Sequence, residues 1–385
     1  MKRVLFVTNG HGEQAIAARI ARELDTVGGI EIDHLSLVGD DVAASRSFRS
    51  VGPQRTLPSG GLIAMGNVRN VIRDVRAGLL PHTFAQLRFL HGVRGRYDLV
   101  VAVGDAFAYG MARRARAAKT VFVGTAKSVH VARYGSFESR MLRSADSIFV
   151  RDEITADDLR RRGVPAGAPG NVIVDLFDEP DATGAQALAG KTVAIFPGSR
   201  QSAYDDAVFA CAIMRTLVQR IPAIEAALSV APGLDHARFA QVLQEDRWDV
   251  TVMESTSIPF VLSFGGAPVV TAWAGSPGAM LANATLVLGQ AGTANEAAAA
   301  RGIPIAAFER DPHSGGAWYR RRQRGLLDGA LAILPRSLDA ATNEVAALLL
   351  DGARRGRMAA IGRERMGAPG GARKIAAHLR ERLQC

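Results

Sequence analysis

The sequence contains few cysteines and few aromatic residues. Only two of its 385 residues are cysteines, Cys211 and Cys385, so neither a disulfide framework nor a cysteine-based zinc site is expected. This composition suits a reducing cytoplasm. Aromatic residues make up 6% of the chain, which disfavours a stacking platform for single-stranded nucleic acid.

Long apolar runs are also missing. The longest uncharged stretch, 255–295, is interrupted by three prolines and carries Asn283 and Gln290, so no block of about 20 apolar residues remains for a membrane span. At the amino terminus, Met1-Lys2-Arg3 passes directly into an apolar run without the length or cleavage pattern of a signal peptide. We therefore expect a cytoplasmic protein without a transmembrane helix.

Acidic residues are outnumbered by basic ones. The chain has 37 Asp and Glu against 47 Lys and Arg, a net charge of +10. Most of the basic residues are arginines, which bind phosphate and carboxylate groups well. Phosphorylated small molecules, an anionic membrane surface and nucleic acid remain open as partners on charge alone.

The pattern of apolar residues predicts an α/β fold. Short, β-branched apolar runs alternate with helix-like segments, which is typical of parallel sheets covered by helices on both faces. One series of expected strands comprises Val4–Val7, Glu31–Leu37, Leu99–Val103, Thr120–Val123 and Ser147–Val150. A second series comprises Thr192–Phe196, Ala226–Val230, Asp249–Met253, Val269–Ala272, Thr285–Leu288 and Pro304–Phe308.

The two series indicate two Rossmann-like domains. The first spans 1–176 and the second 191–366, with 177–190 as a linker because it combines Asp-Glu-Pro-Asp with Thr-Gly-Ala. We expect their parallel sheets to face an interdomain cleft. Ligands of such sheets bind outside the carboxyl ends of the strands, so residues that follow strands are the candidate site residues.

The loop Gly289–Glu296 is the first candidate site. It connects an apolar strand to a helix-forming segment, so its backbone N–H groups and the positive helix end can face a phosphate. Glu296 is expected in the first helical turn, where it can also hold a ribose hydroxyl. A tight, well-capped strand-to-helix turn is the alternative. The candidate donor-binding residues here are Gly292, Thr293, Ala294, Asn295 and Glu296.

Phe196–Arg200 follows the first strand of the second series. Pro197 and Gly198 force a turn, Ser199 can cap the next helix, and Arg200 can bind a phosphate with two parallel hydrogen bonds. A turn with an incidental surface arginine is the alternative. Gly198, Ser199 and Arg200 are further candidate donor-binding residues.

Asn9–Glu13 follows the first strand of the chain. Gly10 and Gly12 satisfy a loose dinucleotide fingerprint, with Asp40 near the end of the second strand as the ribose-binding acid. The same loop is consistent with contact to an acceptor sugar, or with a structural turn. His11 is a candidate base or hydrogen-bond donor.

Asp105 stands at the carboxyl end of a predicted strand and precedes the apolar segment Ala106–Tyr109. A carboxylate in this place can act as general base, or it can simply cap the following helix.

Val68–Leu80 reads as an amphipathic basic helix. Arg69, Arg73 and Arg76 share one face, and Asp74 is the only acid between Arg55 and Tyr97. Such a helix can lie on a lipid headgroup surface or present an ordinary solvated face.

Together these segments resemble the lipid-A-disaccharide synthase family, in particular its synthase-related branch. The similar segments follow the family order over nearly the whole chain: Asn9–Glu13, Gly104-Asp105, Arg151–Ala156, Gly170–Asp175, Phe196–Arg200, Gly292–Glu296, Gln323–Leu327 and Met366–Gly370. Two departures stand out. The first loop reads Asn-Gly-His-Gly-Glu where the true synthases have a Ser-Gly-Asp-type loop, and Glu296 stands one place early.

The resemblance implies an inverting glycosyltransferase of the two-domain GT-B type. It implies transfer of a glucosamine-type sugar, with or without an acyl group, from a UDP donor to a lipid-linked acceptor, with no metal and no cofactor. Asp105 would be the base, Gln323 would join the donor site, and the final helix in 367–385 would cross back to the first domain. The basic helix would contact the inner membrane peripherally; nucleic acid is not an expected partner.

Three other functions remain open on the sequence. A UDP-sugar 2-epimerase would use the same architecture. An NAD-dependent oxidoreductase would bind its cofactor at the Gly10 loop. A non-catalytic protein would bind the UDP-sugar without turnover.

Overall fold

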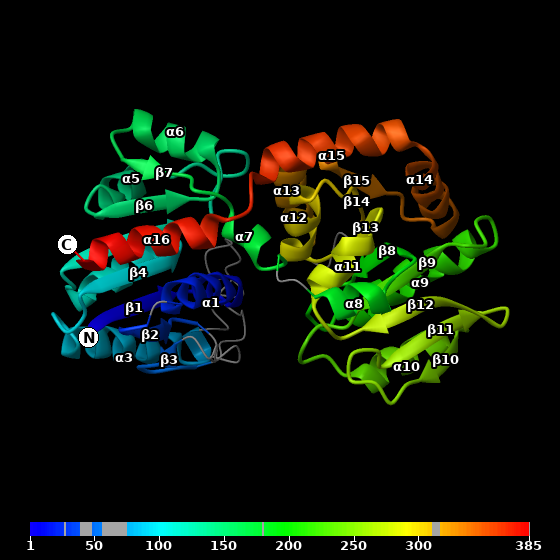
Figure 1. Cartoon of the computed structure of the whole chain (residues 1–385), viewed down its shortest axis with the longest axis horizontal. Helices are drawn as coiled ribbons and strands as arrows, with labels where there is room; N and C mark the ends of the chain where they lie inside the picture. Colours follow the sequence, from blue (N-terminus) through cyan, green and yellow to red (C-terminus); the bar gives the residue numbers. More distant parts are fainter. Residues whose placement is uncertain (27, 39–47, 56–74, 179–180, 310–315, 385) are drawn as a thin grey trace. The chain divides into compact units, whose positions relative to one another are not determined.

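The chain folds into two compact units (Figure 1). The structure is a computed structural model and describes all residues except 27, 39–47, 56–74, 179–180, 310–315 and 385. The first unit comprises residues 1–176 and 367–385, and the second comprises 177–366. No helix of the described residues is both long and apolar enough to span a membrane.

The first unit is built on a seven-stranded, wholly parallel sheet in the order β3-β2-β1-β4-β5-β6-β7. Its strands are β1 (Lys2–Thr8), β2 (Ile30–Ser36), β3 (Arg49–Ser50), β4 (Leu99–Gly104), β5 (Lys119–Gly124), β6 (Ser147–Val150) and β7 (Ala166–Gly167). Every residue of β4 is buried, as expected for a strand covered on both faces. The strand order reverses between β1 and β4, which makes their carboxyl ends a ligand-binding position.

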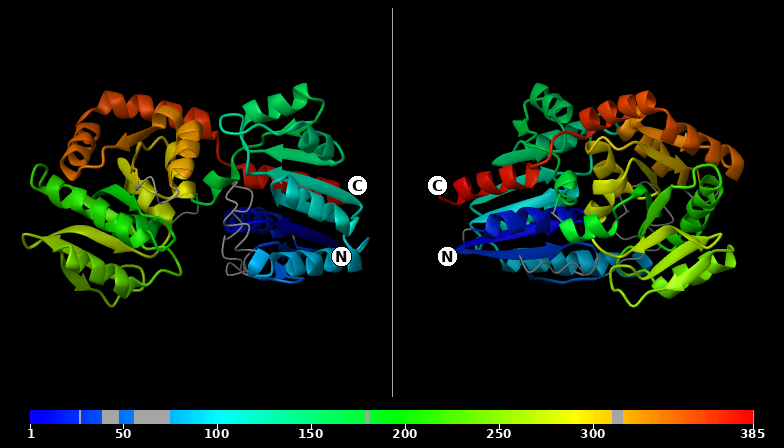
Figure 2. Two further views of the ribbon diagram at one scale, coloured as in Figure 1. Left: turned by 180° about the vertical axis from the view of Figure 1, so that it is seen from behind. Right: turned by 45° about the vertical axis from the view of Figure 1, so that its right-hand side comes forward.

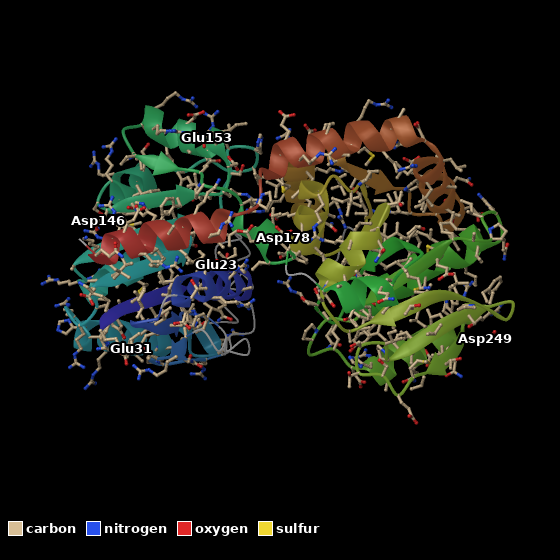
Figure 3. The ribbon with its side chains drawn as sticks, in the orientation of Figure 1. Glu23, Glu31, Asp146, Glu153, Asp178 and Asp249 are labelled. Atoms are coloured by element: carbon tan, nitrogen blue, oxygen red, sulfur yellow. The ribbon has the colours of Figure 1, made fainter. Side chains whose placement is uncertain are left out.

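Two helical layers cover this sheet. Helices α1 (His11–Asp25) and α16 (Gly371–Gln384) share one apolar core, and α4 (Ala106–Ala112), α5 (Ser136–Leu142) and α6 (Glu153–Arg161) share another. Within the described ranges, the remaining helices of this unit are α3 (Leu79–Gly92), the short η2 (Arg113–Ala115) and α7 (Val172–Asp175). Figure 3 labels Glu153 at the start of α6.

The second unit contains an eight-stranded sheet in the order β10-β11-β12-β9-β8-β13-β14-β15. Its strands are β8 (Lys191–Phe196), β9 (Glu225–Ser229), β10 (Asp249–Val252), β11 (Phe260–Phe264), β12 (Ala267–Trp273), β13 (Leu286–Gly289), β14 (Ile305–Phe308) and β15 (Leu331–Leu334). All pairs are parallel except β10–β11 and β11–β12. The sheet is therefore mainly parallel, with an antiparallel edge formed by β10, β11 and β12, where short connections make antiparallel pairing possible.

The helices of the second unit are α8 (Ala182–Ala187), α9 (Ala203–Val218), α10 (His236–Glu245), α11 (Pro277–Asn283), α12 (Gly292–Ala300), α13 (Gly316–Leu327), η4 (Asp328–Ala330), α14 (Leu338–Leu350) and α15 (Gly352–Met366). The segment 177–190, interpreted from sequence as a linker, contains α8 and belongs to this unit. Asn283 Nδ2 donates to the Ala185 carbonyl oxygen at 2.8 Å, which fixes α8 to α11.

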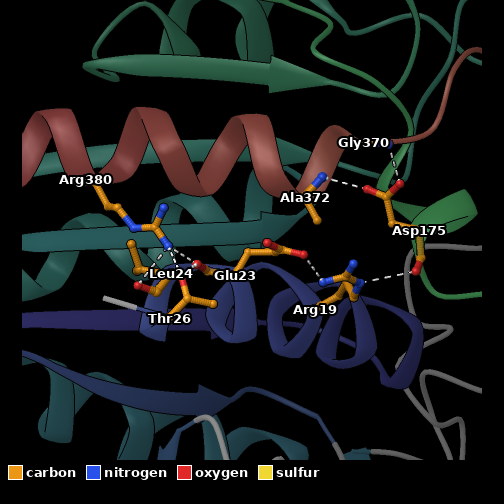
Figure 4. A network of polar contacts seen from close by, with 8 residues as sticks. All are labelled: Arg19, Glu23, Leu24, Thr26, Asp175, Gly370, Ala372 and Arg380. Carbon is orange, nitrogen blue, oxygen red and sulfur yellow. Dashed lines mark hydrogen bonds and ion pairs between the residues drawn. The ribbon is translucent and has the colours of Figure 1, made fainter. Parts of the chain in front are cut away.

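The C-terminal helix α16 packs against α1 in the first unit (Figures 1 and 2). The Asp175 carboxylate accepts hydrogen bonds from the amides of Gly370 at 2.5 Å and Ala372 at 2.7 Å, and so caps the start of α16 (Figure 4). Near its other end, Arg380 donates to Thr26 Oγ1 at 2.6 Å, at the end of α1.

Candidate functional site

The first candidate site lies in the second unit, where β13 ends and α12 begins. Ala291, in an extended conformation, is the N-cap of α12. Among the described residues no side chain caps this helix, so the first-turn amides from Gly292 to Ala294 have no side-chain acceptor. Thr293 is exposed beside them. These amides and the positive helix end form an arrangement that can bind a phosphate.

Asn295 and Glu296 occupy other environments than the sequence suggests. Asn295 is fully buried, and its Nδ2 donates to the Gly289 carbonyl oxygen at 3.1 Å, so it ties the helix to the strand end. Glu296 is half-buried and lies just beyond the first turn, because α12 already begins at Gly292. Its expected position in the first turn is therefore wrong, and its ribose contact stays a prediction.

The loop after β8 lies beside this helix start. The carbonyl oxygen of Phe196, the last residue of β8, accepts hydrogen bonds from the amides of Gln290 at 2.9 Å and Ala291 at 3.2 Å. Gly198 has a φ of 114°, which favours glycine. Arg200 is exposed, and within the described chain its side chain has no acidic partner. Its guanidinium is therefore available to a ligand at the end of β8.

Ser199 does not cap the following helix. Helix α9 begins at Ala203, with Ser202 at the N-cap position, and Ser199 is exposed three residues earlier. The expected capping role of Ser199 is wrong because the turn after β8 is longer than a direct strand-to-helix connection. Its hydroxyl remains free to be tested as a ligand contact.

Gln323 lies beneath the loop after β13. Its side chain is 5% exposed; Nε2 donates to the Ala291 carbonyl oxygen at 3.3 Å, and Oε1 accepts from Arg320 at 2.6 Å. Gln323 therefore supports the loop from inside. Gln290 lies in the loop that the sequence singled out but was not among the candidate donor-binding residues, and neither was Arg320. Arg320, Gln323 and the buried Leu327 are nevertheless spaced along one face of α13.

The second candidate site lies in the first unit, at the carboxyl ends of β1 and β4. Gly104 ends β4 with a φ of 138°, and a methyl group on it would overlap Asn9 Oδ1. Glu13, in the first turn of α1, reaches the same place, since its Cγ is 3.3 Å from the position of that methyl group. Thr125 Oγ1, after β5, is 3.5 Å from Glu13 Oε1.

Asp105 is the N-cap of α4. Its Oδ1 accepts hydrogen bonds from the amides of Phe107 and Ala108, both at 3.0 Å. The capping role that the sequence left open is thus present. In the described residues, Oδ2 makes no hydrogen bond, so the half-buried carboxylate retains one oxygen that can accept a proton.

Two further carboxylates, those of Glu138 and Asp152, act together with Asp105 on the side chain of Tyr134. The Tyr134 side chain is buried, and its hydroxyl has no hydrogen-bond partner in the described part of the chain. Burial raises the pKa of Tyr134, and the negative charges of Glu138, Asp105 and Asp152 raise it further. Glu138 also accepts a hydrogen bond from Lys127 Nζ at 2.6 Å. Neither Glu138 nor Glu13 was predicted from the sequence to be a catalytic group.

The structure does not describe every residue that was predicted for the acceptor or membrane side. Arg69, Arg73 and Asp40 lie outside the described residues, as does the side chain of His11. Gly10 is the extended N-cap of α1, and Arg76 is exposed. Gly12 follows in α1 with open space around its α-carbon. Among the residues that the structure places, no group of three or more His, Cys, Asp or Glu side chains could hold a metal ion.

The chain is similar to known proteins in its fold rather than in its sequence. No protein-family model matches the chain, nor does any curated protein sequence. A solved structure of a putative UDP-N-acetylglucosamine 2-epimerase from Listeria monocytogenes is similar, with 14% identity, 99% of this chain and 96% of the other covered, and a TM-score of 0.61. So is the MnaA–UDP structure from S. aureus, with 13% identity, coverage of 100% and 97%, and a TM-score of 0.61.

A glycosyltransferase is similar to the same degree. The calicheamicin glycosyltransferase CalG4 has 17% identity, coverage of 100% of this chain and 98% of the other, and a TM-score of 0.59. The predicted fold class is confirmed: the chain has two α/β domains with mainly parallel sheets, the fold of these GT-B glycosyltransferases and epimerases.

Proposed function

We propose that the protein is an inverting glycosyltransferase that uses a UDP-sugar donor. The observation that carries this proposal is the start of α12, which offers first-turn amides without a side-chain cap. The exposed Arg200 follows the neighbouring strand β8, whose last carbonyl oxygen bonds to the amides of Gln290 and Ala291 just before this helix. Of the similar solved structures, one is of a putative UDP-N-acetylglucosamine 2-epimerase and another contains UDP, which supports the same donor class here. In this proposal the second unit binds the donor.

The leaving group is the diphosphate of the donor. When the bond between the anomeric carbon and the phosphate oxygen breaks, that oxygen takes the electron pair and the negative charge. The amides of Gly292–Ala294, the positive end of α12 and the Arg200 guanidinium stabilise this charge. These groups supply positive charge without a metal ion, and no cofactor takes part in the step.

Asp105 acts as the general base. An acceptor hydroxyl attacks the anomeric carbon from the face opposite the diphosphate, and its proton passes to Asp105 Oδ2 while Oδ1 continues to cap α4. A new glycosidic bond forms, UDP leaves, and the configuration of the anomeric carbon is inverted. His11 is the second candidate for contact with the acceptor.

The acceptor is a lipid-linked sugar, and the sugar transferred is of the glucosamine type, as in lipid-A-disaccharide synthases. Helix α3 supports this choice, because Leu80 and Phe84 lie one turn apart and are 64% and 73% exposed. Arg76 and Arg88 are exposed nearby, and residues 75–97 contain no acid. An apolar and basic surface of this kind favours peripheral contact with an anionic membrane.

UDP-sugar 2-epimerisation is the second candidate function. A base removes the C2 proton while the bond from C1 to the diphosphate oxygen breaks, which leaves a C1–C2 double bond and UDP; UDP then adds back to C1 as a proton is delivered to the opposite face of C2. Acid and base groups are therefore needed on both faces of the sugar. Glu13 and Glu138, at the same edge of the sheet as Asp105, offer such groups. The similar structure from Listeria monocytogenes is that of a putative UDP-N-acetylglucosamine 2-epimerase, which favours this function.

Product analysis with UDP-N-acetylglucosamine distinguishes these functions. A transferase releases UDP only when a lipid-linked sugar acceptor is added, whereas an epimerase forms the isomeric UDP-sugar without acceptor. A non-catalytic protein binds the nucleotide sugar and forms neither product. Asp105→Asn should abolish transfer and retain UDP binding, because Asn preserves the helix cap but accepts no proton. Unchanged turnover would exclude Asp105 as the base.

Arg200→Ala tests the donor site. We expect its UDP affinity to fall about tenfold, because a charge-assisted hydrogen bond to phosphate is lost. Arg220→Ala is the matched control, since Arg220 is also exposed but follows the other end of α9. Equal UDP affinities of the two variants in titration calorimetry would contradict the role of Arg200.

A further inference from the structure

A buried polar network lies beneath the start of α12. Gln290, Arg320 and Gln323 are 6%, 7% and 5% exposed. Burying a guanidinium and two amides costs free energy unless their polar atoms are hydrogen-bonded. A buried network in which these hydrogen bonds are made holds its side chains in a fixed geometry. The three side chains come from the loop after β13 and from α13.

Gln290 joins the carboxyl ends of neighbouring strands. Its main-chain amide donates to the Phe196 carbonyl oxygen at the end of β8 at 2.9 Å, and its side-chain Nε2 donates to the Phe308 carbonyl oxygen at the end of β14 at 2.8 Å. Since Gln290 itself follows β13, one residue fixes the relative positions of the ends of β8, β13 and β14.

Arg320 fixes Gln290 and the helix cap at the same time. Its Nη2 donates to Gln290 Oε1 and to the Phe308 carbonyl oxygen, the latter at 3.0 Å. Its Nη1 donates to Gln323 Oε1 at 2.6 Å, and Gln323 Nε2 donates to the carbonyl oxygen of Ala291, the N-cap of α12. Both branches therefore end at the residues immediately before the first-turn amides.

We propose that Arg320 is a positioning residue for the donor diphosphate. Through Gln290 and Gln323 it holds the cap of α12, so that the first-turn amides keep the orientation in which they bind phosphate. This inference rests on the proposed donor site. The planar guanidinium reaches both branches in one plane, which a lysine ammonium cannot do even though it carries the same charge.

The network would also contribute to stability, so the test must separate stability from phosphate binding. A stability effect alone would lower the affinity of the second unit for all of its ligands, or for none. A positioning effect lowers the affinity for UDP and leaves the affinity for uridine, which has no phosphate, unchanged. The ratio of UDP affinity to uridine affinity is therefore the quantity to measure.

Titration calorimetry of the full chain with UDP and with uridine tests the proposal. We expect Arg320→Lys and Arg320→Met each to lower UDP affinity about tenfold, the loss of one to two well-oriented hydrogen bonds, with uridine affinity unchanged. Gln323→Met should act in the same direction and keeps the test valid if Arg320→Met fails to fold. Arg321→Met, an exposed residue of the same helix, is the control for the lost charge.

The outcomes are distinct. If the unchanged protein does not bind UDP, the proposed donor function is overturned. If it binds UDP and Arg320→Lys binds UDP as tightly, Arg320 acts through charge alone and the positioning role is overturned. If the affinities for UDP and for uridine fall together, the network serves stability only, and the positioning role is again overturned.

Discussion

Gly104 and Asp105 are adjacent at the end of β4 and have different structural roles. Gly104 adopts a positive φ so that Asn9 can lie against it, while Asp105 turns the chain into α4 and caps it. The sequence predicted a carboxylate at this strand end but left its role open. The structure adds that the capping role uses only one oxygen, which leaves the other for proton transfer.

Gly104→Ala should destabilise the protein by about 1–3 kcal/mol, because the new methyl group meets Asn9 and the backbone is strained. Gly12→Ala is the opposite case, since Gly12 lies in α1 with open space around it, and we expect a gain of about 0.5–1 kcal/mol. Denaturant unfolding measures both. A Gly104→Ala variant as stable as the unchanged protein would show that the loop can move without cost.

His378 should make stability depend on pH. Its Nε2 is 2.7 Å from Ser147 Oγ, and burial, followed by the nearby Arg382, lowers the pKa of His378 from 6.5. The unfolded chain therefore binds a proton that the folded chain does not. The free energy of unfolding should fall as the pH drops below about 6.5 and stay level above it.

His378→Gln should flatten this dependence, because glutamine can hydrogen-bond to Ser147 but does not titrate. Denaturation midpoints at several pH values between about 5.5 and about 7.5 measure the difference between the two proteins. The lowered pKa of His82 acts in the same direction and leaves some slope in the variant. Identical slopes would contradict the assignment to His378.

The sequence pattern predicted the presence of helix α12 but not the residue at which it begins. The sequence indicated a phosphate-binding loop followed by a helix, but Gly-Thr-Ala carries no strong helix signal, so the expected helix began too late. In the structure α12 starts at Gly292 and packs tightly on α15. Its small side chains permit this approach: a methyl group on Gly362 would be 2.5 Å from the Ala299 carbonyl oxygen.

Gly362→Ala should therefore separate α12 from α15 and cost about 1–3 kcal/mol, since the obstacle is backbone rather than a movable side chain. Gly356→Ala, in the same helix with open space around it, should instead stabilise by about 0.5–1 kcal/mol. Thermal unfolding of both variants measures the contrast. Equal melting temperatures would mean that the two helices can move apart freely.

At the scale of the whole molecule, the chain is divided between two units that each contain a topological switch point. The C-terminal segment returns to the first unit, where buried Ile375, Leu379 and Leu383 of α16 join the core of α1. The Asp175 carboxylate holds the start of α16 through two amides. Stability of the first unit thus depends on the last residues of the chain.

Asp175→Ala should lower the unfolding transition of the first unit, because the buried amide of Ala372 and the partly buried amide of Gly370 lose their acceptor at a cost of about 1–3 kcal/mol. Asp178→Ala is the control. Asp178 (labelled in Figure 3) forms a partly exposed ion pair with Arg301 at 3.1 Å in the second unit, and its loss should cost about 1 kcal/mol or less. Calorimetry resolves the two transitions. A shift of the second-unit transition in Asp175→Ala would contradict this assignment.

The sequence by itself determined the α/β class, eleven of the strands and the loops that follow them, because apolar runs and turn residues are local signals. Strands β3, β7, β11 and β15 were not among the expected ones. Each predicted strand overlaps an observed one. Strand order, the antiparallel edge of β10 to β12 and the burial of Arg320 and Gln323 were decided only by tertiary structure. These features depend on contacts between segments far apart in the chain, and a polar residue can be exposed or buried with the same neighbours in sequence.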